Sequence, residues 1–431
     1  MPCAELLPEQ PLTPAELPAD LDNNVNWSPD GQMLVFDCRT ESGIGGNGRL
    51  GVLYVSSGEV RVILCQNPVH GVGAPSFLSQ GEVVAIHALP GAPYDFTRRA
   101  GRIVPVDGGP GRCLDSRDVR PPFTPGALRG GTHKHEPDAS GEWVGFTYND
   151  DVMKTTCGSD LRNVGVSRRG VRAPVERDSA GVCIEGESFS VLLTACVEAP
   201  RPGSDDIRRA EGDCWVGADG FRDRDGSRVR ARAFRGLVAP ADHPARPLVC
   251  DVFLVEVPDD LTVPGPLGPL EGTTENYPKP PLGARVRRLT RTADRRDPAL
   301  RGAAGHLRAP ADGRWIAFVA AGERGLPGAG RPQVHVVSPA TGEAKQLSAL
   351  PGGVAGDPRF SPDGRFVAIG GEDGALYAIR AEEDRWGEAD ALTLPNAAPA
   401  INTVVSPDSR RIAYNRLTGG IPRIYVADAP A

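Results

Sequence analysis

Four of the seven histidines fall at positions from which their imidazoles could share one ligand. His133 and His135 are two residues apart, a spacing that puts both side chains on one side of a β-strand. His87 lies in a neighbouring repeat and could supply a third nitrogen, while His306 comes from a more distant repeat. Imidazole suits Zn, Mn, Fe or Ni, so this pattern predicts a divalent metal site. The alternative is that backbone or carboxylate partners hold these histidines in the fold.

Five further polar residues could take part in catalysis beside such a metal. Arg129 precedes the segment GGTHKH and could hold a carboxylate through two parallel hydrogen bonds. We assign proton transfer to Tyr94, Asp95, Tyr148 and Asp150. The competing interpretation is that Tyr94 and Asp95 only hold their loop.

Polar residues also recur at fixed distances from a repeated turn. Positions seven residues before the turn glycine, or before Ser409 in its place, are not apolar, and positions six residues after it are mostly polar where a buried strand should be apolar. We assign substrate binding to residues at or beside these positions, namely Asn24, Asp37, Arg39, Asn149, Asp357 and Asn402. The nearby pair Arg98 and Arg99 is most simply explained as a solvated strand start.

The turn belongs to a sequence repeat with the pattern SPDG. Proline presets φ at the first turn position, aspartate can bond its own backbone, and glycine ends the turn, so two antiparallel strands must flank it. Clear copies are NVNWSPDGQMLVFD, DPRFSPDGRFVAIG and NTVVSPDSRRIAYN, beginning at Asn24, Asp357 and Asn402. Weaker copies begin at Ala74, His133 and His306, and a degenerate copy at Cys183 brings the number to seven.

A third and a fourth strand follow each hairpin, and four strands per repeat are typical of a β-propeller blade. We therefore predict an all-β chain that forms one seven-bladed propeller domain over residues 1–431. The last repeat is one strand short, and the N-terminal segment AELLPEQPLT is expected to complete it, which would remove free sheet edges. Residues 200–283 are predicted to be a long insertion between blades 4 and 5 and a candidate lid.

Composition excludes several classes of protein. The formal net charge of −7 argues against a nucleic-acid partner. There is no leader with a basic start and an apolar run and no long apolar stretch, so we expect a cytoplasmic protein without a membrane partner. Nine cysteines without a CxxC pair indicate reduced thiols. Serine hydrolases and nucleotide-dependent enzymes would need a G-x-S-x-G elbow, a P-loop or a GxGxxG before a helix, and the sequence contains none of these.

The repeats resemble the TolB-type propeller repeat, also known as PD40. Longer segments resemble a bacterial propeller family of unknown function, the YidR type: YDFTRRAGRIV at 94–104, PFTPGALRGGTHKH at 122–135 and FTYNDDVM at 146–153. The HKH pair also resembles oligogalacturonate lyases, propellers in which three histidines and a glutamine bind manganese. In this chain Gly130 stands where that resemblance expects the glutamine, so the substrate cannot be carried over.

These observations favour a metal-dependent enzyme, a lyase, isomerase or hydrolase. Its substrate would be a small polar molecule, carboxylated or sugar-like, bound in the central funnel. The alternative is a non-catalytic TolB-like scaffold for protein interaction, or a module that binds a small ligand without converting it. A scaffold would be expected to show aromatic patches, and only 6% of the residues are aromatic. The sequence does not determine the oligomeric state.

Overall fold

The computed structural model describes residues 9–40, 43–89, 93–176, 178, 182–242 and 246–430. Strands dominate this part of the chain, and the predicted all-β class is confirmed. The described helices are one short α-helix, α1 (Asp151–Cys157), and the 3-10 helices η1 (Ile44–Gly46), η2 (Pro68–His70), η3 (Thr292–Asp294), η4 (Pro298–Leu300) and η5 (Glu383–Arg385). None of the described helices is long and apolar enough to span a membrane.

Two antiparallel sheets come from the first quarter of the chain. The first has three strands in the order β1 (Met33–Asp37), β2 (Arg49–Tyr54) and β3 (Glu59–Cys65). The second has four in the order β4 (Val72–Ser79), β5 (Glu82–Ala88), β6 (Arg99–Pro105) and β7 (Arg112–Cys113). Successive strands in each sheet are neighbours, as expected for a chain that folds in consecutive hairpins.

An eight-stranded sheet follows and consists of two antiparallel groups. One group contains β8 (Gly130–Pro137), β9 (Trp143–Asp150), β10 (Arg162–Arg169) and β11 (Ser188–Leu192). The other contains β12 (Arg209–Trp215), β15 (Ala231–Val238), β16 (Val249–Glu256) and β17 (Val286–Arg288). A parallel pair between Arg162 and Arg209 joins them. A separate ribbon, β13 (Phe221–Arg222) with β14 (Arg228–Val229), lies in the connection from β12 to β15.

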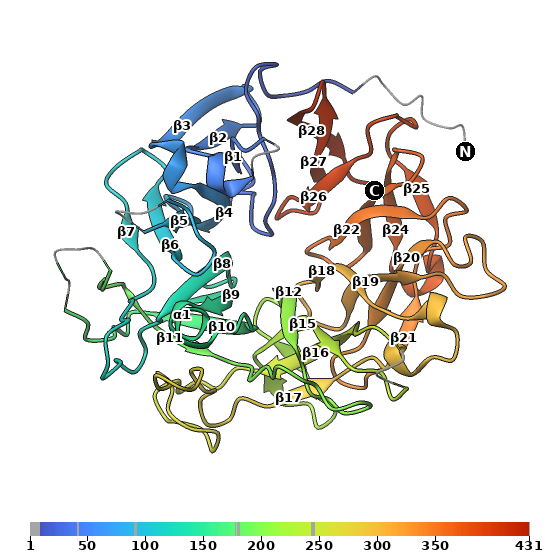
Figure 1. The fold of residues 1–431 in the computed structure, drawn as a ribbon. Helices are drawn as coiled ribbons and strands as arrows, with labels where there is room; N and C mark the ends of the chain where they lie inside the picture. Colours follow the sequence, from blue (N-terminus) through green and yellow to red (C-terminus); the bar gives the residue numbers. More distant parts are fainter. Residues whose placement is uncertain are drawn as a thin grey trace.

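Three antiparallel sheets complete the described chain. Two have four strands each: β18 (Ala304–Arg308), β19 (Ile316–Ala321), β20 (Pro332–Val337), β21 (Ala344–Gln346); and β22 (Val354–Phe360), β23 (Phe366–Gly371), β24 (Leu376–Arg380), β25 (Ala389–Ala391). The last has three: β26 (Ile401–Val405), β27 (Arg411–Thr418) and β28 (Ile421–Asp428). Figure 1 shows the sheets arranged around a central axis, with β4, β8, β12, β18, β22 and β26 nearest to it. We call these six the inner strands.

Apolar side chains pack between neighbouring sheets. Val35 and Val52 of the first sheet pack in one cluster with Phe77 of the second. Leu254 of the eight-stranded sheet packs with Phe318 of the next sheet in the same way. The core therefore lies between the sheets, and the axis is left to polar residues.

The SPDG turns lie at one end of the inner strands, which we call the turn end. In the first copy, Ser28 donates to Asp30 at 2.6 Å, and the backbone N–H of Met33 donates back to the serine hydroxyl at 2.9 Å. Gly31 closes the turn with a positive φ of 67°, which glycine adopts without strain. The strands on either side of the turn are thereby fixed as an antiparallel pair.

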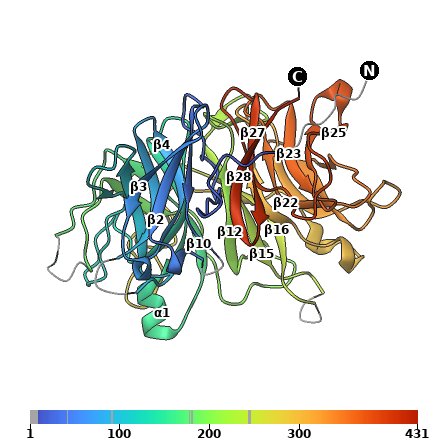
Figure 2. The same cartoon turned by 90° about the horizontal axis from the view of Figure 1, so that it is seen from above.

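The other end of the inner strands, which α1 follows after β9, is called the α1 end, and Figure 2 shows α1 protruding there. Each inner strand contains a β-bulge, because its register with the next strand shifts. Each bulge includes a residue with φ between 47° and 82°. These residues are Ala74, Lys134, Gly212, Gly305, Gly356 and Asn402. A bulge re-aims the side chains that follow it, so the strands no longer alternate strictly.

The predicted insertion at 200–283 is not all loop. Most of 209–256 is strand, because β12, β15 and β16 belong to the eight-stranded sheet. The loop itself runs over 257–285, between β16 and β17. The degenerate repeat at Cys183 does not form a hairpin, since Ser188–Leu192 is a single strand paired with β10.

The N-terminal segment lies along the last strand. The N–H of Leu12 donates to the carbonyl of Ile424 at 2.8 Å, and the N–H of Ala19 donates to that of Pro422 at 2.9 Å. Within the described residues 9–22 no strand is assigned beyond an isolated bridge from Asp20 to Asp37. The segment then crosses toward the axis, where its acidic residues meet the inner strands.

Candidate functional site

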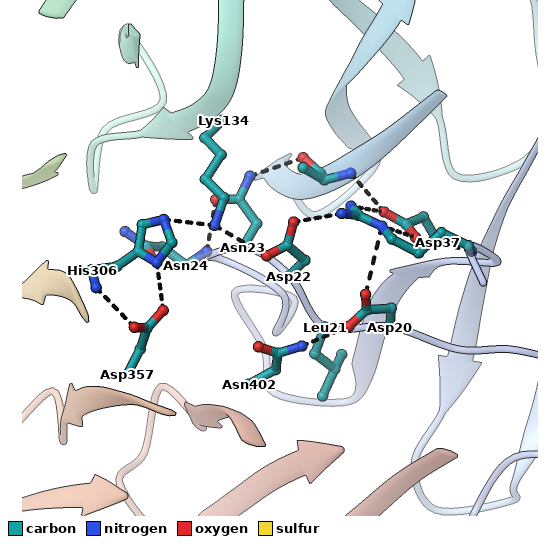
Figure 3. A network of polar contacts seen from close by, with 12 residues as sticks. Asp20, Leu21, Asp22, Asn23, Asn24, Asp37, Lys134, His306, Asp357 and Asn402 are labelled. Atoms are coloured by element: carbon teal, nitrogen blue, oxygen red, sulfur yellow. Dashed lines mark hydrogen bonds and ion pairs between the residues drawn. The ribbon is translucent and has the colours of Figure 1, made fainter. Parts of the chain in front are cut away.

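A chain of polar contacts crosses the axis between distant parts of the sequence (Figure 3). Lys134 of the β8 bulge contacts Asp22 at 3.1 Å and His306 at 3.0 Å. His306 in turn bonds Asp357 through Nδ1, and its backbone N–H donates to the same carboxylate at 2.9 Å. Asp22 also accepts from Arg39 at 2.7 Å. We call this chain of contacts the axial network.

The network continues through the acids that surround Arg39. The guanidinium of Arg39 donates to Asp37 at 2.8 Å and lies 3.5 Å from Asp20. Asp37 is fully buried and also accepts from the backbone N–H of Ala74 at 2.7 Å. Asn402 donates to Asp20 at 2.7 Å. The predicted substrate residues Asp37, Arg39 and Asn402 are thus tied to one another through the N-terminal segment.

The acids of the network have opposite pKa shifts. Burial, followed by the charge of Asp37, raises the pKa of Asp20 to about 7. Burial also acts to raise the pKa of Asp22, but Lys134 and Arg39 outweigh it and lower that pKa to about 2. The pKa of His306 is lowered by burial and by Lys134. His306 is therefore neutral at physiological pH, and its Nε2 can accept from the Lys134 ammonium.

A second group, which shares Lys134 with the axial network, surrounds His133. Burial and four cations, first Arg99 and Arg162 and then Lys134 and Arg39, hold the pKa of His133 well below its usual range. The imidazole makes no hydrogen bond to any described residue. We call His133, Arg99, Arg162 and Lys134 the cation cluster.

Arg99 has two donors without a partner, whereas Arg162 lies 3.9 Å from the carboxylate of Glu211. Arg99 begins β6 and is 3% exposed, so its expected role as a solvated strand start is wrong. One nitrogen of Arg99 bonds the Tyr94 hydroxyl, while its Nε and another nitrogen lack a partner in the described chain. Arg162 donates to Asn149 at 3.0 Å. Burial and the neighbouring Arg209 lower the pKa of Arg162 to about 10, so these guanidiniums repel one another and would be stabilised by an anion.

The four predicted metal ligands do not form one ligand group. Lys134 between His133 and His135 has a φ of 53°, and the β8 register breaks there, so the alternation that would place both imidazoles on one side is interrupted. His135 is fully buried between sheets, where its Nε2 lies 2.9 Å from Thr132 Oγ1 and 3.5 Å from Asp115. Among the residues that the structure describes, no three His, Cys, Asp or Glu side chains are placed to hold a metal.

The other two candidate ligands have their own surroundings. His87 is 8% exposed, and burial followed by the charge of Arg102 lowers its pKa to about 4. His306 is bound into the axial network. A divalent cation next to His133 would also face several protein cations, which oppose it. The donor set therefore does not fit a metal.

Three predicted catalytic residues form a structural group at α1. Asp150 caps this helix by accepting from the N–H of Met153 at 2.8 Å. Its other oxygen accepts from Arg129 and from the hydroxyl of Tyr148, both at 2.9 Å. Arg129 also donates to the carbonyls of Thr273 and Asn276 in the 257–285 loop. Burial raises the pKa of Tyr148 far above its usual range, so its hydroxyl stays protonated. The contacts of Arg129 hold the 257–285 loop against α1, and the group has no hydrogen-bond donor left for a substrate.

The four remaining predicted residues lie in different places. Tyr94 accepts from Arg99 and so borders the cation cluster. Asp95 caps its own loop through Thr97 at 2.9 Å and contacts Lys154 at 3.2 Å. Asn24 donates to Glu136 nearer the turn end. Asn149 supports Arg162, as described above.

The sequence prediction missed Arg162 and the acids Asp20 and Asp22. Arg162 lies in the segment DLRNVGV, where a basic residue stands immediately before an apolar strand. The acids lie in LPADLDNN, in which two aspartates alternate with apolar residues ahead of the first repeat. Both sequence patterns could have been used to predict polar side chains near the axis.

Comparisons with known proteins agree with this architecture. A family model described as a protein of unknown function (DUF3748) matches residues 85–180. The uncharacterized protein YidR of Escherichia coli (strain K12) is 34% identical to this chain over 406 residues. The alignment covers 91% of this chain and 91% of YidR.

Two solved structures share the fold at low identity. An oligogalacturonate lyase in complex with manganese superposes with a TM-score of 0.56 at 12% identity, covering 97% of this chain and 92% of that chain. An oligogalacturonate lyase from Vibrio parahaemolyticus gives a TM-score of 0.53 at 12% identity, covering 97% and 93%. At this identity the likeness concerns the propeller fold alone.

Proposed function

This chain belongs to the YidR family, and we propose that it is a lyase-like enzyme that takes a proton from a small carboxylated substrate at the cation cluster. The observation that carries the proposal is a neutral imidazole, His133, in the field of Arg99 and Arg162, of which Arg99 is buried with unused donors. A base next to cations is the arrangement needed to remove a proton adjacent to a carboxylate, because the cations stabilise the negative charge that develops.

The chain's own groups can divide this chemistry between them. Arg99 and Arg162 bind the substrate carboxylate and stabilise the enediolate formed when the adjacent carbon loses its proton to His133. The electron pair then forms a double bond to the next carbon while the carbon–oxygen bond to the leaving group breaks. The departing oxygen takes up a proton from the His133 imidazolium or from water. Return of the proton to the opposite face of the same carbon would instead give an isomerase.

Substrate binding also adjusts the base. An imidazole with a strongly lowered pKa is neutral but weakly basic, and a catalytic base works best with a pKa near the working pH. A bound carboxylate offsets the field of Arg99 and Arg162, which are the largest charge contributions to the low pKa of His133. The pKa of His133 therefore rises when the correct substrate arrives, and the base is strongest only in the complex.

No metal is required by this proposal, because the donor set does not fit one. The two solved relatives named oligogalacturonate lyases act, by their names, on a carboxylated sugar oligomer, and this supports a substrate of that class. A module that binds such a ligand without converting it is the second candidate, since the same unused arginine donors would serve it.

We also propose that the ring has seven blades and is closed by the N-terminal segment. The eight-stranded sheet then counts as two blades, joined through the pair Arg162 and Arg209. The hydrogen bonds from Leu12 and Ala19 to β28 support the segment as the missing outer strand of the last blade. Of the predicted insertion, we propose only the loop at 257–285 as a lid.

The test is an elimination assay with galacturonate oligomers, followed by the ultraviolet absorbance of the new conjugated double bond. His133→Gln should lower kcat by about 10²–10⁴-fold, as expected for a lost general base, and Arg99→Met and Arg162→Met should both raise KM and lower kcat, because they bind the carboxylate and stabilise the enediolate. The exposed Arg410→Met is the matched control for charge. Turnover by His133→Gln at the wild-type rate would exclude His133 as the base.

Two further results distinguish the candidates. Binding without product, lost in Arg99→Met, would make the protein a ligand-binding module. Calorimetry in buffers of different ionisation enthalpy should show proton uptake when a carboxylate binds, because the pKa of His133 rises on binding. Binding without proton uptake would contradict the proposed adjustment of the base.

A further inference from the structure

A cavity of about 280 Å³ lies on the axis toward the turn end, away from the cation cluster. Its walls come from inner strands and from the turns that follow them, with Pro310 and Pro362 among the turn residues. Its polar lining includes Asn24, Glu136, Asp138, Arg308 and Arg359. Asp138 accepts from Ser140 and from the backbone N–H of Trp143. A space of this size holds several waters or one small organic anion.

The two arginines of this cavity have no carboxylate partner among the described residues. Arg308 is 6% exposed, its Nε has no hydrogen-bond partner there, and its one hydrogen bond goes to the carbonyl of Leu307 at 2.6 Å. Arg359 is half-buried and donates only to the backbone carbonyls of Thr403, Asn24 and Asn23, at 3.1, 3.1 and 3.0 Å. Burial of a guanidinium without a counter-charge is costly.

The nearest acids are already bound to other groups. Glu136 accepts from Arg232 at 3.0 Å and from Asn24. Asp357 accepts twice from His306. Neither carboxylate therefore neutralises Arg308 or Arg359 by direct contact.

We propose that this cavity binds a small oxyanion, a carboxylate or a phosphate, between Arg308 and Arg359. Arginine matches both groups because its planar fork presents parallel donors. The surroundings of Arg359 agree with this occupant: burial and the neighbouring Arg308 hold its pKa well below the usual range, and an anion between the two cations would relieve that repulsion. The site is separate from the cation cluster, because none of the four residues of that cluster lines the cavity.

The test is calorimetric titration of the full-length protein with inorganic phosphate and, separately, with succinate, in a buffer without other oxyanions. Wild type should bind at least one of them and gain thermal stability in its presence. Arg308→Met should weaken binding by about tenfold or more, as expected for a lost charged hydrogen bond. Arg410→Met removes the same charge from an exposed turn and should bind like wild type. The two titrants distinguish a phosphate site from a carboxylate site.

Arg359→Met also loses three bonds to the backbone, so it is expected to be less stable, and Arg308→Met is the deciding variant. Equal affinity of Arg308→Met and wild type, or no binding of either anion by wild type, would overturn the proposal. Arg99→Met tests the independence of the two sites. It should keep the anion affinity of the axial cavity whether or not the protein turns over galacturonate oligomers, so failure of one proposal leaves the other decidable.

Discussion

At the turn end of the channel, three repeats make the same contact, whereas at the α1 end the inner strands share only a backbone shape. Ser28, Ser361 and Ser406 donate to the aspartate two residues further on at 2.6, 2.6 and 2.5 Å. The bulges repeat a left-handed residue, but the residues beside it include histidine, aspartate and glutamate. The SPDG turns therefore serve the fold, whereas the residues beside the bulges vary and are free to carry chemistry.

The largest test of this comparison is at the bulge of β12. Asp213 follows Gly212 and pairs with Arg232, whose side chain is fully buried and contacts Glu136 as its other acid. Asp213→Ala should lower the free energy of unfolding by about 3–5 kcal/mol, because it leaves a buried charge half-paired. Urea denaturation measures this loss. Asp219→Ala, which removes an exposed partner of Arg228, should change stability by less than about 0.5 kcal/mol.

The second test uses pH at the axial network. The raised pKa of Asp20, about 7, means that the folded protein binds a proton more tightly than the unfolded chain. This contribution to stability is present below about pH 4 and is lost as the pH rises through 7. Asp20→Asn should therefore become more stable relative to wild type by about 4 kcal/mol between pH 4 and pH 8, measured by denaturant unfolding at each pH.

Asp22→Asn provides the contrast of sign. Its carboxylate has a pKa lowered to about 2, so it stabilises the fold above about pH 4 and loses this effect as the pH falls through 2. The variant should be less stable than wild type at neutral pH, and the deficit should shrink in acid. A pH-independent difference in both variants would contradict the network.

A third test addresses the backbone shape shared by the bulges. Gly356 has a φ of 82°, and an added Cβ would meet Ile401 only at 4.0 Å, so Gly356→Ala introduces strain without a clash. It should lower stability by about 1–2 kcal/mol. Ala74, at the same place in β4, has a φ of 47°, and Ala74→Gly should not destabilise the protein. Thermal unfolding of both variants would show whether the bulges share the same requirement for a left-handed backbone conformation.

The smallest effect is expected at the turn end. Ser361→Ala removes the bond to Asp363 at 2.6 Å and the bond from the N–H of Phe366 at 3.2 Å. The loss should be about 1 kcal/mol with no change in the elimination assay. A loss of activity without a loss of stability would mean that the SPDG turn is not purely structural.

The sequence predicts the turn end well and the site less well, for physical reasons. The SPDG contacts are local, so they can be predicted directly from neighbouring residues such as Ser28, Asp30 and Gly31. The separation of His133 from His135 depends on the left-handed Lys134, which no periodicity rule would assign to a lysine. Arg99 is buried because of the loop that contains Tyr94.

The strand group that lacks an SPDG turn, β12 with β15, β16 and β17, is also the one that the sequence prediction misplaced. Its first two strands, β12 and β15, are separated by the β13–β14 ribbon rather than by a tight turn. The sequence therefore contains no SPDG-type repeat at this place. Residues 188–192 were apolar enough to stand in for it. Long connections hide strand pairing, because pairing then depends on distant residues.

The path of the N-terminal segment has a consequence for how the molecule is made. Thr13 accepts a hydrogen bond from the backbone of Ile424, 411 residues further along the chain. During synthesis this segment emerges long before β28, so it waits until nearly all of the other described strands exist before its partner appears. Contacts of such separation form late, so Asp20 and Asp22 are expected to join the axis in one of the last steps of folding.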